Sequence, residues 1–294
     1  MTNANTGRAR DLNRYAPRLQ FTHASLEEFL DSPVPLDEGI HSIAIGSATA
    51  DFLYEERGGP LLVVFPAALG KTVTWPFFTG LGIAHDVSAS LLALSDPSVE
   101  LPGVGTGWSL GDHRVSFHTI LPAIIRKFAP SRRLIFFGMS AGGYSALHYV
   151  SKFENAIAVV GNPRTHLFTP PTALQHRAPA LYGTEDPGEI STMVPVGIRP
   201  TGNRIIYLQN SGDFVYFSSH MIPYLQKIDG DADVWTIIDY WGEGHVAPPG
   251  DLVRAVLAAV LADPLDSAGA VRFRSVEDVR AHQAALNIRR MALR

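Results

Sequence analysis

The chain contains no cysteine among its 294 residues. Disulfide bonds, thiolate metal sites and a cysteine nucleophile are therefore excluded. Long apolar runs are also missing, since none approaches the roughly 18 residues that a membrane-spanning helix needs. The first twenty residues carry several arginines and lack the apolar core of a signal peptide. We therefore expect a cytoplasmic protein without a membrane span.

Charge of either sign is sparse and evenly spread. Lys and Arg number 24 and Asp and Glu 28, a formal net charge of −4, so no basic stretch indicates nucleic-acid binding. Metal-binding histidine pairs and a Walker-type loop are missing as well, and GVGTGW at residues 103–108 lacks the third glycine of a dinucleotide-binding loop. We expect no metal, no cofactor and no nucleic-acid partner.

Apolar residues are plentiful, at 46% of the chain, and they are arranged as short strands that alternate with helices. Helical spacing predicts helices at residues 109–128, 141–153, 215–228 and 251–262. Between them lie short, almost continuously apolar segments, typical of strands buried on both faces: LLVVF, LLALS, LIFFG, AIAVV, RIIYLQ and VWTIID. This pattern predicts an α/β fold with a mostly parallel twisted sheet, helices on both faces and an antiparallel leading edge.

The domain organisation follows from composition. No internal repeat or low-complexity linker divides the chain, so one domain is favoured, over residues 21–264. Residues 1–20 are expected to form a mobile arm. Residues 164–203, rich in proline and glycine, predict an insertion or lid over the sheet. Residues 265–294 have helical spacing and predict a C-terminal helical appendage.

The strongest motif is Gly-Met-Ser-Ala-Gly at residues 138–142, which matches G-x-S-x-G between an apolar strand and a helix. In this motif the serine occupies a strained turn, and glycines two residues before and after it avoid a clash. The amide of Ala141 would then point to where an oxyanion forms. These features predict Ser140 as a nucleophile, and the alternative is a capping serine at a helix N-terminus.

A serine nucleophile needs a base, and His245 is the best placed of the eleven histidines because its glycine-flanked loop directly follows the last strong strand. Asp213, just past the strand RIIYLQ, would orient the imidazole. The order Ser140, Asp213, His245 is that of α/β-hydrolases. Asp239 is the rival acid, although it lies close to His245 in sequence. Asp96, in a Ser-Asp-Pro segment, is expected to be a turn residue.

The second oxyanion donor is expected from the loop after LLVVF. Pro66 has no N–H, so Ala68 is the first candidate and Ala67 the next. Five large apolar residues are candidates for the substrate pocket: Trp75, Phe77, Phe78, Met139 and Phe214. For the three aromatic residues that follow the loop, ordinary packing in the core or the lid is an equal alternative.

Six segments between residues 91 and 249 add a family resemblance: LLALSDPSVEL, TGWSLG, FFGMSAGGYSALHYV, VVGNPRT, IYLQNSGDFVYFSSHMIPYL and WGEGHVAPP. Together they resemble bacterial α/β-hydrolase-like proteins of capsular polysaccharide biosynthesis (the XcbB/CpsF type). The resemblance implies an α/β-hydrolase fold over roughly residues 42–262, a triad of Ser140, Asp213 and His245, and acyl transfer to or from a sugar. The loop at residues 66–68 departs from the group, in which a His-Gly or Gly-Ala pair is common.

Two classes of function remain open. The first is an esterase-like serine hydrolase or acyltransferase, which forms an acyl-enzyme on Ser140 from a small-molecule or glycan-linked acyl substrate. The alternative is a non-catalytic α/β-hydrolase-like scaffold in polysaccharide biosynthesis, because a fold does not determine a function. A prolyl-oligopeptidase-type peptidase is disfavoured because no propeller domain precedes the hydrolase region. The sequence does not decide between water and a sugar hydroxyl as acceptor, nor does it determine the oligomeric state.

Overall fold

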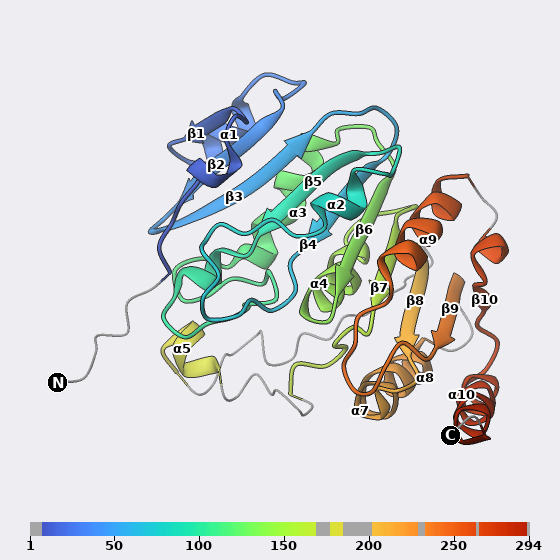
Figure 1. Ribbon diagram of the computed structural model, residues 1–294. Coiled ribbons are helices and arrows are strands. Elements are labelled where there is room, and N and C mark those ends of the chain that lie inside the picture. The colour runs from blue at the N-terminus through green and yellow to red at the C-terminus, as the bar shows by residue number, and fades with distance from the viewer. Residues whose placement is uncertain (1–7, 169–176, 185–201, 229–232, 263–264, 293–294) are drawn as a thin grey trace.

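The computed structural model describes residues 8–168, 177–184, 202–228, 233–262 and 265–292. Ten strands in this part of the chain form one sheet (Figure 1). The strands are β1 Gln20–His23, β2 Gly39–Ile45, β3 Ala48–Glu55, β4 Leu61–Phe65, β5 Ser90–Ser95, β6 Leu134–Met139, β7 Ile157–Gly161, β8 Arg204–Asn210, β9 Asp233–Asp239 and β10 Val271–Arg272. Their order in the sheet is β1-β2-β3-β5-β4-β6-β7-β8-β9-β10.

The sheet is mostly parallel, as the sequence predicts. The central strands β5, β4, β6, β7, β8 and β9 all run in the same direction. β3 is antiparallel to both β2 and β5, so the predicted antiparallel edge is confirmed. The Gly58-Gly59-Pro60 segment leads from β3 to β4, but these two strands do not pair because β5 lies between them.

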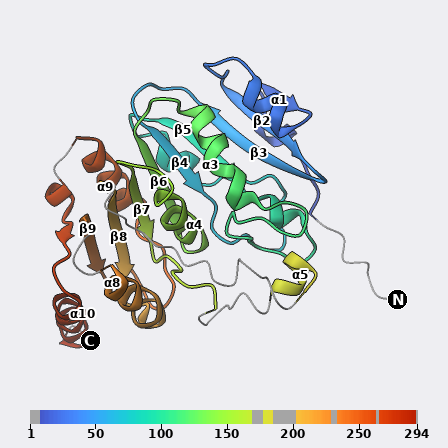
Figure 2. The ribbon, with the colours of Figure 1, turned by 180° about the vertical axis from the view of Figure 1, so that it is seen from behind.

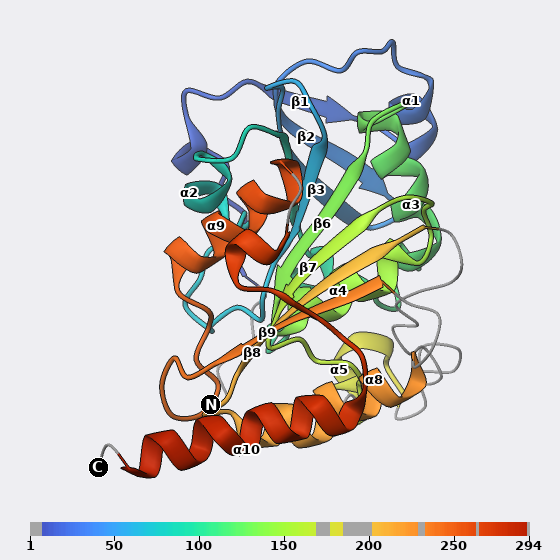
Figure 3. The same cartoon turned by 90° about the vertical axis from the view of Figure 1, so that its right-hand side faces the viewer.

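Helices cover both faces of the sheet (Figures 2 and 3). They are α1 Leu26–Asp31, α2 Leu81–Ala84, α3 Phe117–Phe128, α4 Ala141–Val150, α5 Ala178–Tyr182, α7 Phe214–Tyr216, the π-helical turn η4 Phe217–Met221, α8 Ile222–Lys227, α9 Gly250–Ala262 and α10 Val276–Ala292. Side chains of α1, α3, α4, α8 and α10 join the core on one face, and those of α2 and α9 join the core on the other.

Strand β4 shows why the central strands are apolar throughout. Its residues Leu61, Val63 and Phe65 belong to the core on the α3 and α4 face, whereas Leu62 and Val64 belong to the core on the α2 and α9 face. Successive side chains of a strand point to opposite faces, and here both faces are buried. Each of the five side chains is at most 1% exposed.

Helix α3 begins at Phe117 and not at residue 109 as the helical spacing predicts. Trp108 and Ser109 have positive φ values of 54° and 53°, which a right-handed helix does not accommodate. Asp112 N then donates to Val115 O at 3.0 Å and closes a tight turn before the helix. The loop that results passes over the carboxyl ends of the parallel strands, where the candidate site lies.

Residues 8–20, which belong to the arm predicted to be mobile, make long-range contacts in the structure. The Arg8 guanidinium donates to the main-chain carbonyls of Gly70 at 2.6 Å and Val73 at 2.9 Å. It also donates to the carbonyls of Val99 at 3.0 Å and Val104 at 3.2 Å. One side chain therefore joins the loop after β4 to the segment after β5.

The chain after residue 264 extends the sheet and covers its end. β10 pairs antiparallel with β9. Gln283 on α10 donates from Nε2 to Ser211 O at 2.7 Å, beside the end of β8. None of the helices in the described ranges combines the length and apolarity needed to cross a bilayer. Of the predicted lid at 164–203, residues 169–176 and 185–201 lie outside the described residues.

Candidate active site

Ser140 lies between β6 and α4 in a backbone conformation that serine rarely adopts, with φ 51° and ψ −112°. The turn has room only because of its glycines. A Cβ on Gly138 would lie 2.2 Å from Gly142 O, and a Cβ on Gly142 would lie 2.5 Å from Phe65 O. The G-x-S-x-G pattern is therefore a steric requirement of the strained turn that presents the serine hydroxyl.

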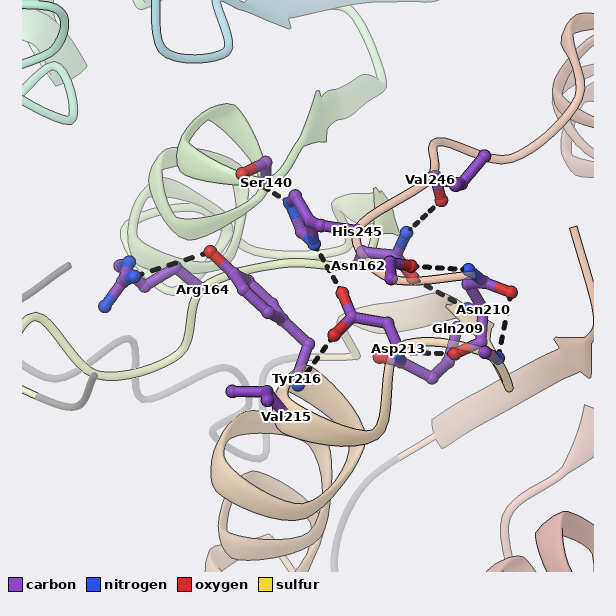
Figure 4. Close-up of polar contacts among 12 residues, drawn as sticks. Ser140, Asn162, Arg164, Gln209, Asn210, Asp213, Val215, Tyr216, His245 and Val246 are labelled. Atoms are coloured by element: carbon purple, nitrogen blue, oxygen red, sulfur yellow. Dashed lines mark hydrogen bonds and ion pairs between the residues drawn. The ribbon is translucent and has the colours of Figure 1, made fainter. Parts of the chain in front are cut away.

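The side chains of Ser140, Asp213 and His245 meet at this turn (Figure 4). His245 Nε2 lies 2.9 Å from Ser140 Oγ, and His245 Nδ1 lies 2.5 Å from Asp213 Oδ2. Asp213 follows β8, and His245 lies on the loop between β9 and α9. A carboxylate only accepts hydrogen bonds, so Nδ1 carries the proton and Nε2 is left to accept the serine proton.

Tyr216 holds both Asp213 and His245 in place. Its backbone N–H donates to Asp213 Oδ1 at 3.1 Å, where the carboxylate caps α7. Its ring packs on the His245 imidazole with a centroid separation of 3.9 Å, and His220 lies 4.7 Å from the same ring. Burial lowers the pKa of His220 to about 3, with the positive charge of Arg164 as a further cause, so His220 is neutral at physiological pH.

Two buried asparagines position the loop that carries His245. Asn210 Nδ2 donates to Gly242 O at 2.9 Å and to Gly244 O at 2.8 Å. Asn162 Nδ2 donates to Val246 O at 2.6 Å, and its Oδ1 accepts from the backbone of Asn210 at 2.7 Å. The loop therefore has polar anchors on both sides of His245, and Figure 4 shows the one between Asn162 and Val246.

A cavity of about 250 Å³ opens over Ser140. Its described lining comes from several segments of the chain: Ala68, Thr106, Trp108, Ser140, Ala141, Arg164, Arg177, Tyr216 and His245. The two first candidates for the oxyanion donors, Ala68 and Ala141, both line the cavity, and Ala67 is not among these residues. Ala68 on the loop after β4 and Ala141 at the start of α4 therefore border the space in which a substrate carbonyl would meet the serine.

None of the five predicted pocket residues is part of this lining. Trp75 and Phe78 are 0% and 4% exposed and pack in the core beside residues 8–20, and Phe77 lies partly buried next to them. Met139 packs at the α2 and α9 face of the sheet. Phe214 is 69% exposed at the start of α7. Trp75 and Phe78 thus pack in the interior, as the alternative interpretation has it, whereas Phe77 is only partly buried.

Sequence reasoning missed Thr106, Trp108, Arg164, Arg177 and Tyr216 as lining residues. Most of them lie in segments that carried the family resemblance: TGWSLG contains the first two, VVGNPRT contains Arg164, and IYLQNSGDFVYF contains Tyr216. The signal was therefore present as a motif, but no local chemistry distinguished these residues.

In the described ranges, no group of three or more His, Asp or Glu side chains is placed to hold a metal ion.

Asp96 anchors the loop that brings Thr106 and Trp108 to the cavity. It is 2% exposed, and its Oδ2 accepts from the backbone N–H groups of Gly107 at 2.6 Å and Ser109 at 3.2 Å. Burial raises the pKa of Asp96, and these hydrogen bonds to the carboxylate oppose the rise. The residue expected only to form a turn therefore also organises one wall of the cavity.

We expect Asp96→Asn to destabilise the protein by about 2–4 kcal/mol, because an amide NH₂ would face backbone donors that lose their acceptor. The free energy of unfolding in urea measures the effect, and Asp31→Asn at the exposed end of α1 is the matched control. Equal stability of the Asp96→Asn variant and the unsubstituted protein would contradict the anchoring role.

The fold is that of solved α/β-hydrolases. The capsule O-acetyltransferase of Neisseria meningitidis serogroup A is similar over 78% of this chain and 97% of its own, with a TM-score of 0.56 at 12% identity. A mutant of that protein in complex with CoA covers 76% and 95%, with a TM-score of 0.51 at 11% identity. An S-formylglutathione hydrolase from Agrobacterium tumefaciens covers 79% and 94%, with a TM-score of 0.51 at 14% identity.

No protein-family model and no curated protein sequence matches the chain. The fold of the chain is therefore assigned from its similarity to solved structures. The chain is an α/β-hydrolase-fold protein, and the predicted fold is confirmed. The capsule O-acetyltransferase is among the proteins that share this fold with it.

Proposed function

We propose that the protein transfers acyl groups through an ester on Ser140, as an acyltransferase or an esterase-like hydrolase. One observation carries the proposal: His245 lies 2.9 Å from the Ser140 hydroxyl and 2.5 Å from the Asp213 carboxylate. A serine is activated as a nucleophile when a neutral imidazole can accept its proton and a carboxylate orients that imidazole. The strained turn at Ser140 supports the same role.

In the proposed mechanism, Ser140 Oγ attacks the carbonyl carbon of an ester or thioester while its proton passes to His245 Nε2. The carbonyl π electrons move onto the oxygen, which the amides of Ala141 and Ala68 stabilise. The bond to the leaving oxygen or sulfur then breaks, and the leaving group takes the proton from His245. A second hydroxyl, from water or an acceptor, gives its proton to His245 as it attacks the acyl-serine, and collapse returns a proton to Ser140.

The structural likeness to a capsule O-acetyltransferase that has been solved with CoA supports an acyl-CoA donor and a glycan hydroxyl acceptor. Under this form of the proposal the protein acts in polysaccharide biosynthesis and works in the cytoplasm, where acyl-CoA is made. The S-formylglutathione hydrolase, which is similar over a comparable share of the chain, supports the hydrolytic form. Both forms use the same acyl-enzyme and differ only in the second hydroxyl.

A fluorophosphonate probe tests the acyl-enzyme route, because it reacts covalently with activated serines. We expect labelling of the protein, with the label mapped by mass spectrometry to the peptide that contains Ser140. The Ser140→Ala variant should not be labelled, whereas Ser151→Ala, at the partly buried C-cap of α4, should be labelled normally. Absence of labelling in the folded protein would favour the non-catalytic scaffold.

The same preparation distinguishes transfer from hydrolysis. After incubation with acetyl-CoA, we expect mass spectrometry to find one acetyl group on the peptide that contains Ser140. Faster discharge in the presence of a sugar, with formation of the acetylated sugar, supports the transferase. Discharge at a rate independent of sugar supports the hydrolase.

A further inference from the structure

Two arginines line the cavity over Ser140, and neither belongs to the triad. Arg164 lies just past β7 and is 3% exposed; its backbone N–H donates to Ser140 O at 3.0 Å. Its guanidinium points toward Tyr216, with Nη2 3.4 Å from the hydroxyl oxygen (Figure 4). Arg177 is the N-cap residue of α5, and its guanidinium lies 5.4 Å from the centre of the Trp108 ring.

The described wall of this cavity contains two guanidinium groups and no carboxylate. Burial lowers the pKa of Arg177, and the nearby positive charge of Arg164 lowers it further. Among the described residues, Arg177 Nη1 is buried without a hydrogen-bond partner. A buried charged donor that makes no hydrogen bond is costly, so a group that supplies an acceptor here would bind favourably.

We propose that this cavity binds an anionic group of the substrate, a phosphate or a carboxylate, with Arg177 as its main donor and Arg164 beside it. The inference rests on the proposed function, because it places the anion next to the serine that is acylated. A guanidinium offers parallel N–H groups that match two oxygens of a carboxylate or phosphate, which suits it to this role better than an ammonium.

The position of the two arginines beside Ser140 limits where the anion belongs in the substrate. Both guanidinium groups line the same small cavity as Ser140, so an anion that they bind lies close to the reacting carbonyl. In a CoA thioester the long pantetheine arm keeps the phosphates away from the reacting carbonyl. The anion therefore belongs to the acyl group or to the acceptor, close to the bond that changes. A sugar phosphate, a hexuronate and a dicarboxylic acyl group all satisfy this condition.

Two matched sets of compounds test the inference and separate the two sources. The acyl set compares p-nitrophenyl butyrate with p-nitrophenyl hydrogen succinate, and the acceptor set compares glucose with glucose phosphate and glucuronate. We expect the anionic members of one set to have a kcat/KM about 10- to 100-fold higher than the neutral member, as a charge-assisted hydrogen bond provides.

Arg177→Gln should remove this preference, because it should raise KM for the anionic compound much more than for the neutral one. Arg177→Lys should recover part of the preference, because it keeps the charge but not the paired N–H groups. Arg289→Gln, on the exposed side of α10, makes the same charge change away from the cavity and should leave the preference intact. Arg164 is less suitable for this test because its backbone also contacts Ser140.

Inorganic phosphate gives an independent readout. It should protect Ser140 from the fluorophosphonate probe, and Arg177→Gln should lose the protection. The inference is overturned if Ser140 is labelled but phosphate gives no protection and neither set shows an anionic preference. It is also overturned if Arg177→Gln slows neutral and anionic compounds equally, since Arg177 would then only support Trp108. If Ser140 is never labelled and no ester is turned over, the proposed function fails, and the inference fails with it.

Discussion

Replacement of Ser140 by alanine is expected to lower kcat/KM by about ten thousand-fold or more, because the acyl-enzyme requires this hydroxyl. His245 and Asp213 keep their mutual hydrogen bond, and the cavity keeps its shape, so KM should change little while kcat falls. Ester turnover and the melting temperature, measured on the same preparation, separate a loss of catalysis from a loss of folding.

The control for this variant is Ser151→Ala, which removes a serine hydroxyl from the other end of α4. Its Oγ donates only to the backbone of His148 at 2.7 Å among the described contacts, so its kcat should be close to that of the unsubstituted protein. If Ser140→Ala retained more than about a tenth of the activity, water activated directly by His245 would be the nucleophile, and the acyl-enzyme route would be wrong.

The three triad candidates could be predicted from the sequence because each of them directly follows a strand that the local sequence identifies. Ser140, Asp213 and His245 follow β6, β8 and β9, and these strands are parallel, so their carboxyl ends lie at one edge of the sheet. Continuous apolar runs identified the parallel strands, and the glycines around Ser140 identified the turn. In the structure the three side chains lie within hydrogen-bonding distance of one another, through His245.

The residues that line the cavity could not be predicted from local sequence in this way. Arg177 becomes a neighbour of Trp108, and Arg164 comes to line the same cavity, only through the fold, since no local pattern relates these residues. The loop before α3 reads as helix in the sequence, but positive φ values at Trp108 and Ser109 end the helical path, and the buried carboxylate of Asp96 holds that loop. Long-range hydrogen bonds to backbone groups leave no periodic signal in a sequence.

The aromatic residues after the Ala68 loop were also hard to assign from the sequence, because it does not show whether they line a pocket or pack in the core. Trp75 and Phe78 follow the loop that carries Ala68, so their position in the chain suggested a pocket. Large aromatic side chains serve cores and pockets equally well, and the difference depends on what packs against them. Here residues 8–20 cover them, and Phe78 lies 4.9 Å from the ring of Tyr15.

Asp213→Asn is expected to lower kcat by about a thousand- to ten thousand-fold with little change in the fold. Asp213 accepts from His245 Nδ1 at 2.5 Å and from the backbone of Tyr216 at 3.1 Å. Asparagine has one acceptor oxygen for these two donors. If its NH₂ faces His245, the imidazole takes the tautomer with the proton on Nε2 and cannot accept the proton of Ser140.

The other orientation turns the asparagine oxygen to His245 and its NH₂ to the backbone N–H of Tyr216. That arrangement leaves a buried donor unpaired and displaces the residue that packs on the imidazole. Asp239→Asn is the matched control, because Asp239 is the rival acid, is exposed, and accepts from the adjacent backbone of Tyr240 at 2.7 Å. Steady-state kinetics of both variants decide between the two acids. A large loss in Asp239→Asn with near-normal activity in Asp213→Asn would assign the orienting carboxylate to Asp239, against the hydrogen bonds that place it at Asp213.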